Sequence, residues 1–143
     1  MEKKEKKLKK SKTYKLFLYG TLRRGEALHY ILEKFNPIFK GLGILKEYKM
    51  YCNYFYPFII KGSESDKVIG EVYEFSEEDY FKIIKDLDMI EGNYDRTIVT
   101  IELNQKNIKA ETYISKYPVD KEDKIDELDG IRLIKNGDWK KGD

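Results

Sequence analysis

Apolar and polar residues alternate along several short segments of the chain, which is the pattern of strands with one buried face. The segments that predict strands are 14–19, irregular strands within 39–51, then 68–75, 97–103 and 108–115. In the first segment, Phe17 and Tyr19 share one face while Leu16 and Leu18 share the other. The last two segments flank the polar turn Asn104–Asn107 and therefore predict a hairpin.

Two other segments repeat apolar residues with a helical period. In the segment that begins near Glu26, four apolar residues fall at i, i+3, i+4 and i+7, and Pro37 stops the helix that they predict. These four residues are Leu28, Ile31, Leu32 and Phe35. The clearer helix runs from Ser76 to about Glu91. Its expected buried stripe consists of Tyr80, Ile83, Ile84, Leu87 and Ile90.

Both ends of the clearer helix carry signals of their own. Ser76 and Asp79 fit a capping box, in which the two side chains satisfy free N–H groups of the first turn. Gly92 stands where a left-handed cap would end the helix. Strands outnumber helices, and the last two strands are expected to pair antiparallel. The pattern therefore favours an α+β domain whose sheet curls into a small barrel with helices on one side.

Charge divides the 143 residues into two parts. Residues 1–12 hold seven Lys and two Glu, so a tail of charge +5 precedes a body, 13–143, of charge −3. The length predicts one folded domain, which begins near Thr13. The tail is expected to be a disordered, solubilising extension. Salt-sensitive adhesion to nucleic acid and attraction to an anionic membrane surface are the alternatives.

Connecting segments in the body are less informative. A loop is expected at 53–57, and residues 116–130 form a charged connection. The short segment 131–134 fits either a strand or a helical turn. None of the body segments interleaves basic and aromatic residues as a nucleic-acid-binding sheet does, so nucleic acid is not the expected partner.

Composition excludes several classes of chemistry. Cys52 and His29 are the only Cys and His, so the chain builds neither an intramolecular disulfide nor a Cys/His zinc site, and a Ser–His–Asp triad is not expected. The turn between Gly20 and Gly25 lacks the Lys-Ser/Thr of a phosphate-binding loop. No apolar run is long enough to cross a membrane, and no signal peptide is visible. We expect a cytoplasmic protein without a metal site and without a membrane partner.

One carboxylate stands out by its position. Glu91 ends an apolar helix, where the negative end of the helix dipole disfavours its charged form. Aromatic surroundings would also remove solvent from it, and both effects raise the pKa of a carboxyl group. A carboxyl group with a raised pKa accepts and returns protons near neutral pH. The alternative is an exposed helix-end carboxylate that pairs with Arg96.

The second candidate feature is the turn Tyr19–Leu22, which follows the first strand. A turn that contains glycine leaves successive N–H groups pointing at one place, and such groups bind a carboxylate or an oxyanion. Gly20 would allow a ligand to approach the backbone closely. An ordinary connection between a strand and a helix is the alternative.

Three motifs follow one another along the chain. They are FLYGTLRRG at 17–25, DMIEG at 88–92 with Tyr94 and Arg96 after it, and GDW at 137–139, with Tyr113 preceding this last motif near a strand end. In this order they resemble the γ-glutamylcyclotransferase-like family, also called AIG2-like, in its small bacterial and archaeal form. The resemblance covers about residues 14–139 and leaves the basic tail outside.

The resemblance implies a small mixed β-barrel flanked by helices, and an enzyme that cyclises a γ-glutamyl group to 5-oxoproline without a cofactor. Glu91 would be the proton acceptor and donor, and Tyr19, Gly20, Thr21 and Leu22 would bind the glutamyl part of a small-molecule substrate. Arg23, Tyr94 and Tyr113 are further expected pocket residues, and 48–60 is expected to shape the amine side. A binding protein without turnover on the same fold is the alternative.

Overall fold

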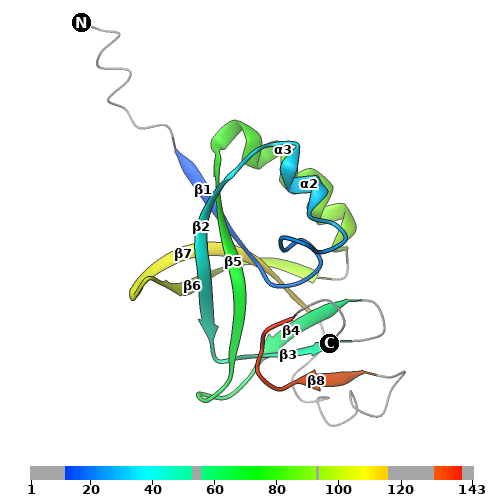
Figure 1. The fold of residues 1–143 in the computed structure, drawn as a ribbon, viewed down its shortest axis with the longest axis vertical. Helices are drawn as coiled ribbons and strands as arrows, with labels where there is room; N and C mark the ends of the chain where they lie inside the picture. Colours follow the sequence, from blue (N-terminus) through cyan, green and yellow to red (C-terminus); the bar gives the residue numbers. More distant parts are fainter. Residues whose placement is uncertain (1–11, 53–55, 93, 116–130, 140–143) are drawn as a thin grey trace, which may run out of the picture.

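Five strands close into a barrel in the computed structural model, which describes residues 12–52, 56–92, 94–115 and 131–139 (Figure 1). Around the barrel the strands are β1 (Thr13–Leu18), β5 (Lys67–Ser76), β2 (Ile38–Lys46), β6 (Tyr94–Leu103) and β7 (Lys106–Ser115). β1 meets β7 in parallel, whereas every other neighbouring pair is antiparallel. The predicted mixed barrel is therefore confirmed.

A second sheet packs at one end of the barrel and has the order β4 (Pro57–Lys61), β3 (Tyr48–Cys52), β8 (Arg132–Ile134) (Figure 1). β8 decides between the two alternatives for 131–134 in favour of a strand. The predicted loop at 53–57 ends one residue early, because Pro57 already pairs with Cys52. Residues 53–55, the charged connection 116–130 and the tail up to residue 11 lie outside the described residues.

The alternation along β1 builds two separate cores. Phe17 points into the barrel and packs among Val72, Ile101 and other buried residues. Leu16 and Leu18 point the opposite way and pack against the helices. Both predicted faces are confirmed, so one strand joins the barrel interior to the layer of helices that covers it (Figure 1).

Helix α3 (Glu77–Ile90) follows the sequence pattern closely at its start. Ser76 caps it, since its Oγ accepts a hydrogen bond from the Asp79 N–H at 3.2 Å. The predicted stripe is buried except at its last residue, Ile90, which is 45% exposed.

The predicted left-handed cap at Gly92 is wrong. Among the described glycines, a positive φ occurs at Gly25, Gly41 and Gly137 only. The chain turns at Glu91 instead, whose carbonyl accepts a hydrogen bond from the Tyr94 N–H at 2.9 Å. β6 begins at Tyr94, three residues before its predicted start.

The first predicted helix is wrong in length. Helix α2 (Tyr30–Glu33) is a single turn, although Ile31 and Leu32 are buried as expected. The N–H of Leu28 bonds the carbonyl of Thr21, seven residues earlier, and this bond belongs to a folded loop and not to a helix. The apolar spacing is correct, but the loop takes up the residues that would have formed the first turns.

The β6–β7 hairpin is tighter than predicted. Asn104 and Gln105 both have positive φ, 53° and 68°, as a two-residue type I′ turn requires. The pairing therefore extends to Leu103 and Lys106.

In the part of the chain that the structure describes, no helix is both long and apolar enough to cross a membrane.

Candidate active site

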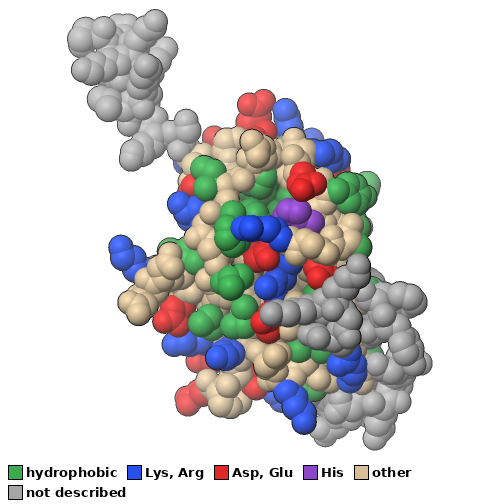
Figure 2. All heavy atoms as spheres, in the orientation of Figure 1, with side chains coloured by type: hydrophobic (Ala, Val, Ile, Leu, Met, Phe, Trp, Pro, Cys, Tyr) green, Lys and Arg blue, Asp and Glu red, His purple; other side chains and the backbone are tan. Residues whose placement is uncertain are grey.

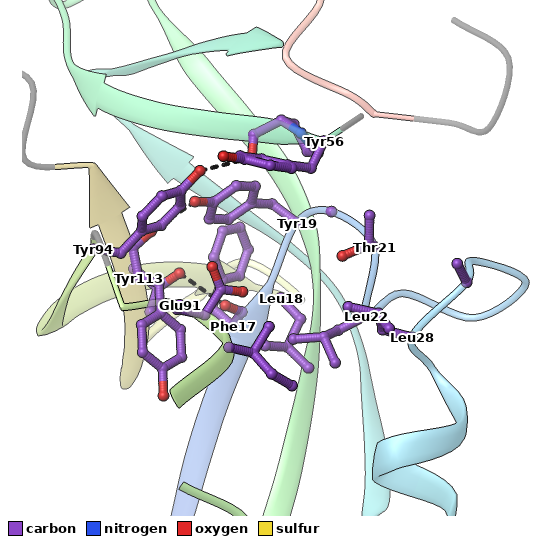
Figure 3. Close-up of a pocket in the computed structure, with 15 residues that line it drawn as sticks. Phe17, Leu18, Tyr19, Thr21, Leu22, Leu28, Tyr56, Glu91, Tyr94 and Tyr113 are labelled. Atoms are coloured by element: carbon purple, nitrogen blue, oxygen red, sulfur yellow. Dashed lines mark hydrogen bonds between the residues drawn. The ribbon is translucent and has the colours of Figure 1, made fainter. Parts of the chain in front are cut away.

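A cavity of about 350 Å³ opens where β1 ends, beside the last turn of α3 (Figure 3). Its volume lies in the range of ~300–1,000 Å³ that is typical of small-molecule sites. The cavity brings Glu91 and the turn Tyr19–Leu22 together, although they lie about seventy positions apart in the sequence. Its lining residues are Phe17, Leu18, Tyr19, Gly20, Thr21, Leu22, Ala27, Leu28, Tyr56, Pro57, Ile90, Glu91, Tyr94, Thr112 and Tyr113.

The residues of the turn after β1 line this cavity. A hydrogen bond of 2.9 Å from the Arg23 N–H to the Gly20 carbonyl closes the turn. Within the described residues, the N–H groups of Gly20, Thr21 and Leu22 donate to no backbone carbonyl of a turn or loop. Such a set of N–H groups is suited to bind one carboxylate or oxyanion.

Gly20 also has a packing role that the sequence did not reveal. A Cβ atom at this position would lie 2.7 Å from Cγ of Pro57, which is closer than real contacts allow. The ring of Pro57 therefore lies directly against the Gly20 backbone, and the first residue of β4 forms part of the cavity wall.

Glu91 lies at the C-terminal cap of α3, and its N–H bonds the Leu87 carbonyl at 2.8 Å. Burial raises the pKa of its carboxyl group to about 7. No hydrogen bond or ion pair of this carboxylate is found within the described ranges. Figure 3 shows the carboxylate beside the rings of Tyr19 and Tyr94. The group therefore combines loss of solvent with lack of a compensating cation.

Arg96, the alternative partner of Glu91, pairs elsewhere. Its guanidinium contacts Asp88 and Glu111, each at 3.1 Å. The interpretation of Glu91 as an exposed carboxylate paired with Arg96 is therefore wrong. Although burial acts to raise it, the hydrogen bonds from Arg96 and Tyr113 hold the pKa of Asp88 below its ordinary value.

Two tyrosine hydroxyls at the cavity are already engaged. Tyr19 donates to the Tyr113 carbonyl at 2.7 Å, and Tyr113 donates to Asp88 at 2.5 Å. Burial is the main cause that raises the pKa of both phenols, and the charge of Glu91 adds to it. Both hydroxyls therefore stay protonated at neutral pH. Tyr19 thus lines the cavity with its hydroxyl already bound to the backbone.

Comparison with known proteins identifies the family to which this fold and these motifs belong. The model of the family "Gamma-glutamyl cyclotransferase, AIG2-like" matches residues 16–141. The chain belongs to this family. The resemblance seen in the three motifs is thus confirmed over most of the chain.

Two relatives show how far the likeness extends. A curated Pyrococcus horikoshii protein, "Putative gamma-glutamylcyclotransferase PH0828", is 36% identical over 74 residues, which are 52% of this chain and 60% of the relative. The chain thus matches less than two thirds of that relative's length. The crystal structure of PH0828 superposes with a TM-score of 0.62 at 26% identity, covering 87% of this chain and 88% of that chain.

A mouse AIG2-like protein has the same fold. Its crystal structure gives a TM-score of 0.69 at 19% identity, over 92% of this chain and 90% of the mouse chain. At this identity the likeness extends to the fold alone. The AIG2-like fold therefore accounts for the barrel and its helices, while the chemistry has to be argued from the cavity of this chain.

The structure corrects one site prediction for this γ-glutamylcyclotransferase-like domain. Arg23 does not line the cavity. Its buried guanidinium contacts Glu71 at 3.4 Å, Asp138 at 2.7 Å and the Trp139 carbonyl at 3.0 Å. Arg23 therefore fastens the turn to β5 and to the C-terminal motif, and its charge is used inside the protein.

Other cavity residues were only partly anticipated. Tyr56 and Pro57 come from the segment expected to shape the amine side, and both line the cavity. Ala27, Ile90 and Thr112 have no signal in the sequence that separates them from ordinary packing residues. His29 lies at the surface (Figure 2), where its Nδ1 is 2.8 Å from the Leu22 carbonyl. No cluster of side chains that could hold a metal occurs in the described part of the AIG2-like domain.

Proposed function

We propose that this protein is a γ-glutamylcyclotransferase, which converts a γ-glutamyl amide or amine to 5-oxoproline and releases the amine. The observation that carries the proposal is the cavity that Glu91 shares with the turn Gly20–Leu22, whose N–H groups donate to no backbone carbonyl of a described turn or loop. One feature is suited to move a proton, and the other is suited to hold the glutamyl carboxylate.

The proposed reaction needs only the substrate and one proton carrier. Glu91 takes a proton from the α-ammonium of the substrate, and the freed amine attacks the δ-carbonyl carbon. The new C–N bond closes a five-membered ring, and the bond from the δ-carbon to the leaving nitrogen breaks. Glu91 then returns the proton to the leaving nitrogen, and the second proton, which the ring nitrogen loses as the lactam forms, ends on the released amine, so no water and no cofactor are consumed.

The environment of Glu91 supports this role. A carboxyl group whose pKa is about 7 is present in both protonation states at neutral pH, as a group that takes and returns a proton must be. The cavity walls would hold the bent conformer that brings amine and carbonyl together. Intramolecular positioning of this kind can be worth ~7–11 kcal/mol of the barrier.

The test is release of 5-oxoproline from a panel of γ-glutamyl amides, amines and peptides, with the amine measured in equal amount. Glu91→Gln keeps the size of the side chain and should lower kcat by about 10²–10⁴-fold. Glu78→Gln is the matched control, because Glu78 lies on the same helix and is exposed. Equal activity of Glu91→Gln and wild type would refute the role of Glu91. Ligand binding without product would favour the binding protein instead.

A further inference from the structure

A cluster of charged side chains lies next to the cavity, at the last turn of α3, and the proposed reaction does not use it. Arg96 on β6 donates to both oxygens of the Asp88 carboxylate, from Nε at 3.1 Å and from Nη2 at 3.2 Å. Its Nη1 donates to Glu111 on β7 at 3.1 Å. The Tyr113 hydroxyl donates to the same Asp88 carboxylate at 2.5 Å. Asp88 therefore holds two donors, and one of them is a guanidinium bound at two points.

Glu91 is a neighbour of this cluster. Asp88 and Glu91 are three residues apart at the end of α3, a spacing that places side chains on the same side of a helix. Arg96 lies directly opposite Tyr113 in the β6–β7 register, and Tyr113 lines the cavity together with Glu91 (Figure 3). The charges of Asp88, Arg96 and Glu91 all act on the Tyr113 phenol. One end of α3 therefore presents two carboxylates beside the guanidinium of Arg96.

The two carboxylates have opposite environments. Although burial acts to raise it, the hydrogen bonds from Arg96 and Tyr113 hold the pKa of Asp88 below its ordinary value. Burial raises the pKa of Glu91 to about 7, and neither of these two donors bonds its carboxylate. Asp88 thus takes the donors that would stabilise a charged carboxylate at this helix end.

The titratable groups that face Glu91 across the cavity are phenols. They are Tyr19 after β1, Tyr56 before β4, Tyr94 on β6 and Tyr113 on β7. Burial is the main cause that raises the pKa of Tyr19 and Tyr113, so these two carry no charge at neutral pH. The described lining contains no Lys or Arg. The cation whose position bears on Glu91 is therefore Arg96, in the cluster beside the cavity.

We propose that Asp88 is a positioning residue for Glu91, because it holds the Arg96 guanidinium outside the cavity and so prevents an ion pair between Arg96 and Glu91. Such an ion pair would favour the charged carboxylate. Glu91 would then hold a proton too weakly at neutral pH to accept and return it. The role in turnover rests on the proposed function, whereas the effect of Asp88 on Glu91 is measurable without substrate.

The first test removes the charge of Asp88 and keeps its shape. In Asp88→Asn, Arg96 keeps Glu111 as its acidic partner among the described residues, and its charge is no longer balanced on the side of α3. The pKa of Glu91 should therefore fall by about 1 from its value of about 7. The measurement is a pH titration by NMR of protein whose glutamate carboxyl groups are labelled with carbon-13. The Glu91 signal is identified by its absence in Glu91→Gln.

A matched control changes the same charge elsewhere on the helix. Asp86 lies on α3 two residues before Asp88 and is exposed. Asp86→Asn removes one negative charge, as Asp88→Asn does, but it leaves Arg96 with both acidic partners. Solvent and salt screen an exposed charge, so the pKa of Glu91 should change by less than about 0.3.

A double variant separates the effect of charge from that of packing. The net charge of Asp88, Arg96 and Glu111 is −1 in wild type, 0 in Asp88→Asn and −1 again in Asp88→Asn/Arg96→Gln. The pKa of Glu91 should therefore return in the double variant to within about 0.3 of the wild-type value. A merely structural role of Asp88 predicts no such rescue, because the double variant lacks more contacts than the single one. Arg96→Gln alone leaves Asp88 without its cation, so the pKa of Glu91 should rise.

The pH dependence of kcat/KM for 5-oxoproline release extends the test to turnover. The acidic limb of this profile reports the pKa of the base in the free enzyme. The limb should move to lower pH by about 1 in Asp88→Asn and should return to its wild-type position in the double variant.

Each outcome separates the role of Asp88 from the proposed function. A fall of the Glu91 pKa that the double variant reverses, together with product, supports both. The same fall and reversal without product from any γ-glutamyl compound supports the positioning role and refutes the cyclotransferase. An unchanged pKa in Asp88→Asn, or a fall that the double variant does not reverse, overturns the positioning role whether or not product forms.

Discussion

Two glutamates lie near the turn that follows β1, and they differ in what surrounds their carboxylates. Glu71 on β5 is 6% exposed and accepts hydrogen bonds from the Arg23 guanidinium, the Arg24 N–H and the Tyr73 hydroxyl. Glu91 is less deeply buried, yet its carboxylate has no such donor among the described residues. Burial alone therefore does not distinguish them.

The partners decide which chemistry each carboxylate can support. Three donors, one of them the buried Arg23 guanidinium, bind the Glu71 carboxylate, so this side chain fastens the turn. Glu91 loses solvent without compensation, so its pKa rises to about 7. The comparison indicates that Glu71 contributes to stability, and it supports the proton-transfer role that we propose for Glu91.

The largest predicted effect is the loss of stability when Glu71 is removed. Glu71→Ala leaves the buried Arg23 with Asp138 as its remaining acidic partner and removes the acceptor of two further donors. Removing one partner of a buried ion pair costs about 3–5 kcal/mol of the free energy of unfolding. Urea denaturation measures the change.

Glu78→Ala is the control for this prediction, because Glu78 is exposed and its ion pair among the described residues is with the exposed Lys82. It should change the free energy of unfolding by at most about 0.5 kcal/mol. If Glu71→Ala were as mild as Glu78→Ala, the network around Arg23 would not hold the turn, and the contrast between the two glutamates would fail.

The second prediction concerns Glu91, whose substitution should raise the free energy of unfolding instead of lowering it. The folded-state pKa of about 7 lies above the ordinary value of 4.5, so folding favours the protonated group. Its contribution to stability is fully present below pH 4.5 and is lost as the pH rises through 7. Glu91→Gln cannot ionise, so at pH 8 it should be more stable than wild type, by at most about 3 kcal/mol.

The same variant should match wild type in stability at pH 4.5, where Glu91 is protonated in the folded protein. Urea denaturation at the two pH values measures this pH-dependent difference in the free energy of unfolding. Glu78→Gln is the control variant and should show no such difference. A Glu91→Gln protein that is less stable than wild type at pH 8 would mean that the carboxylate has a stabilising partner. Glu91 would then resemble Glu71.

The local features of the fold and its barrel class were predictable from the sequence, whereas the strand pair that closes the barrel was not. The two faces of β1 follow from a two-residue period, because each position is inside or outside according to its immediate neighbours. The parallel contact of β1 with β7, which pairs Leu16 with Glu111, closes the barrel between distant parts of the chain. Alternation within one segment contains no information about that partner.

At the candidate site, too, contacts between distant parts of the chain could not be predicted from the sequence. Glu91 and the turn Tyr19–Leu22 could be singled out from a helix end, a glycine turn and the family motifs. Arg23 was expected at the pocket because it follows this turn, yet its partners Glu71 and Asp138 lie 48 and 115 residues away. Only the folded chain reveals that the charge of Arg23 is paired inside the protein.

The smallest predicted effect isolates one donor of Glu71. Burial and the hydrogen bond to Glu71, 2.8 Å long, raise the pKa of Tyr73 to about 12, so the hydroxyl remains a donor. Tyr73→Phe should cost about 1 kcal/mol of the free energy of unfolding, since one buried hydrogen bond is lost while the ion pair with Arg23 remains. Tyr14→Phe, which loses an exposed hydrogen bond of 3.3 Å to Glu77, should cost less. A Tyr73→Phe variant as damaging as Glu71→Ala would show that the phenol, and not the buried cation, is what makes Glu71 differ from Glu91.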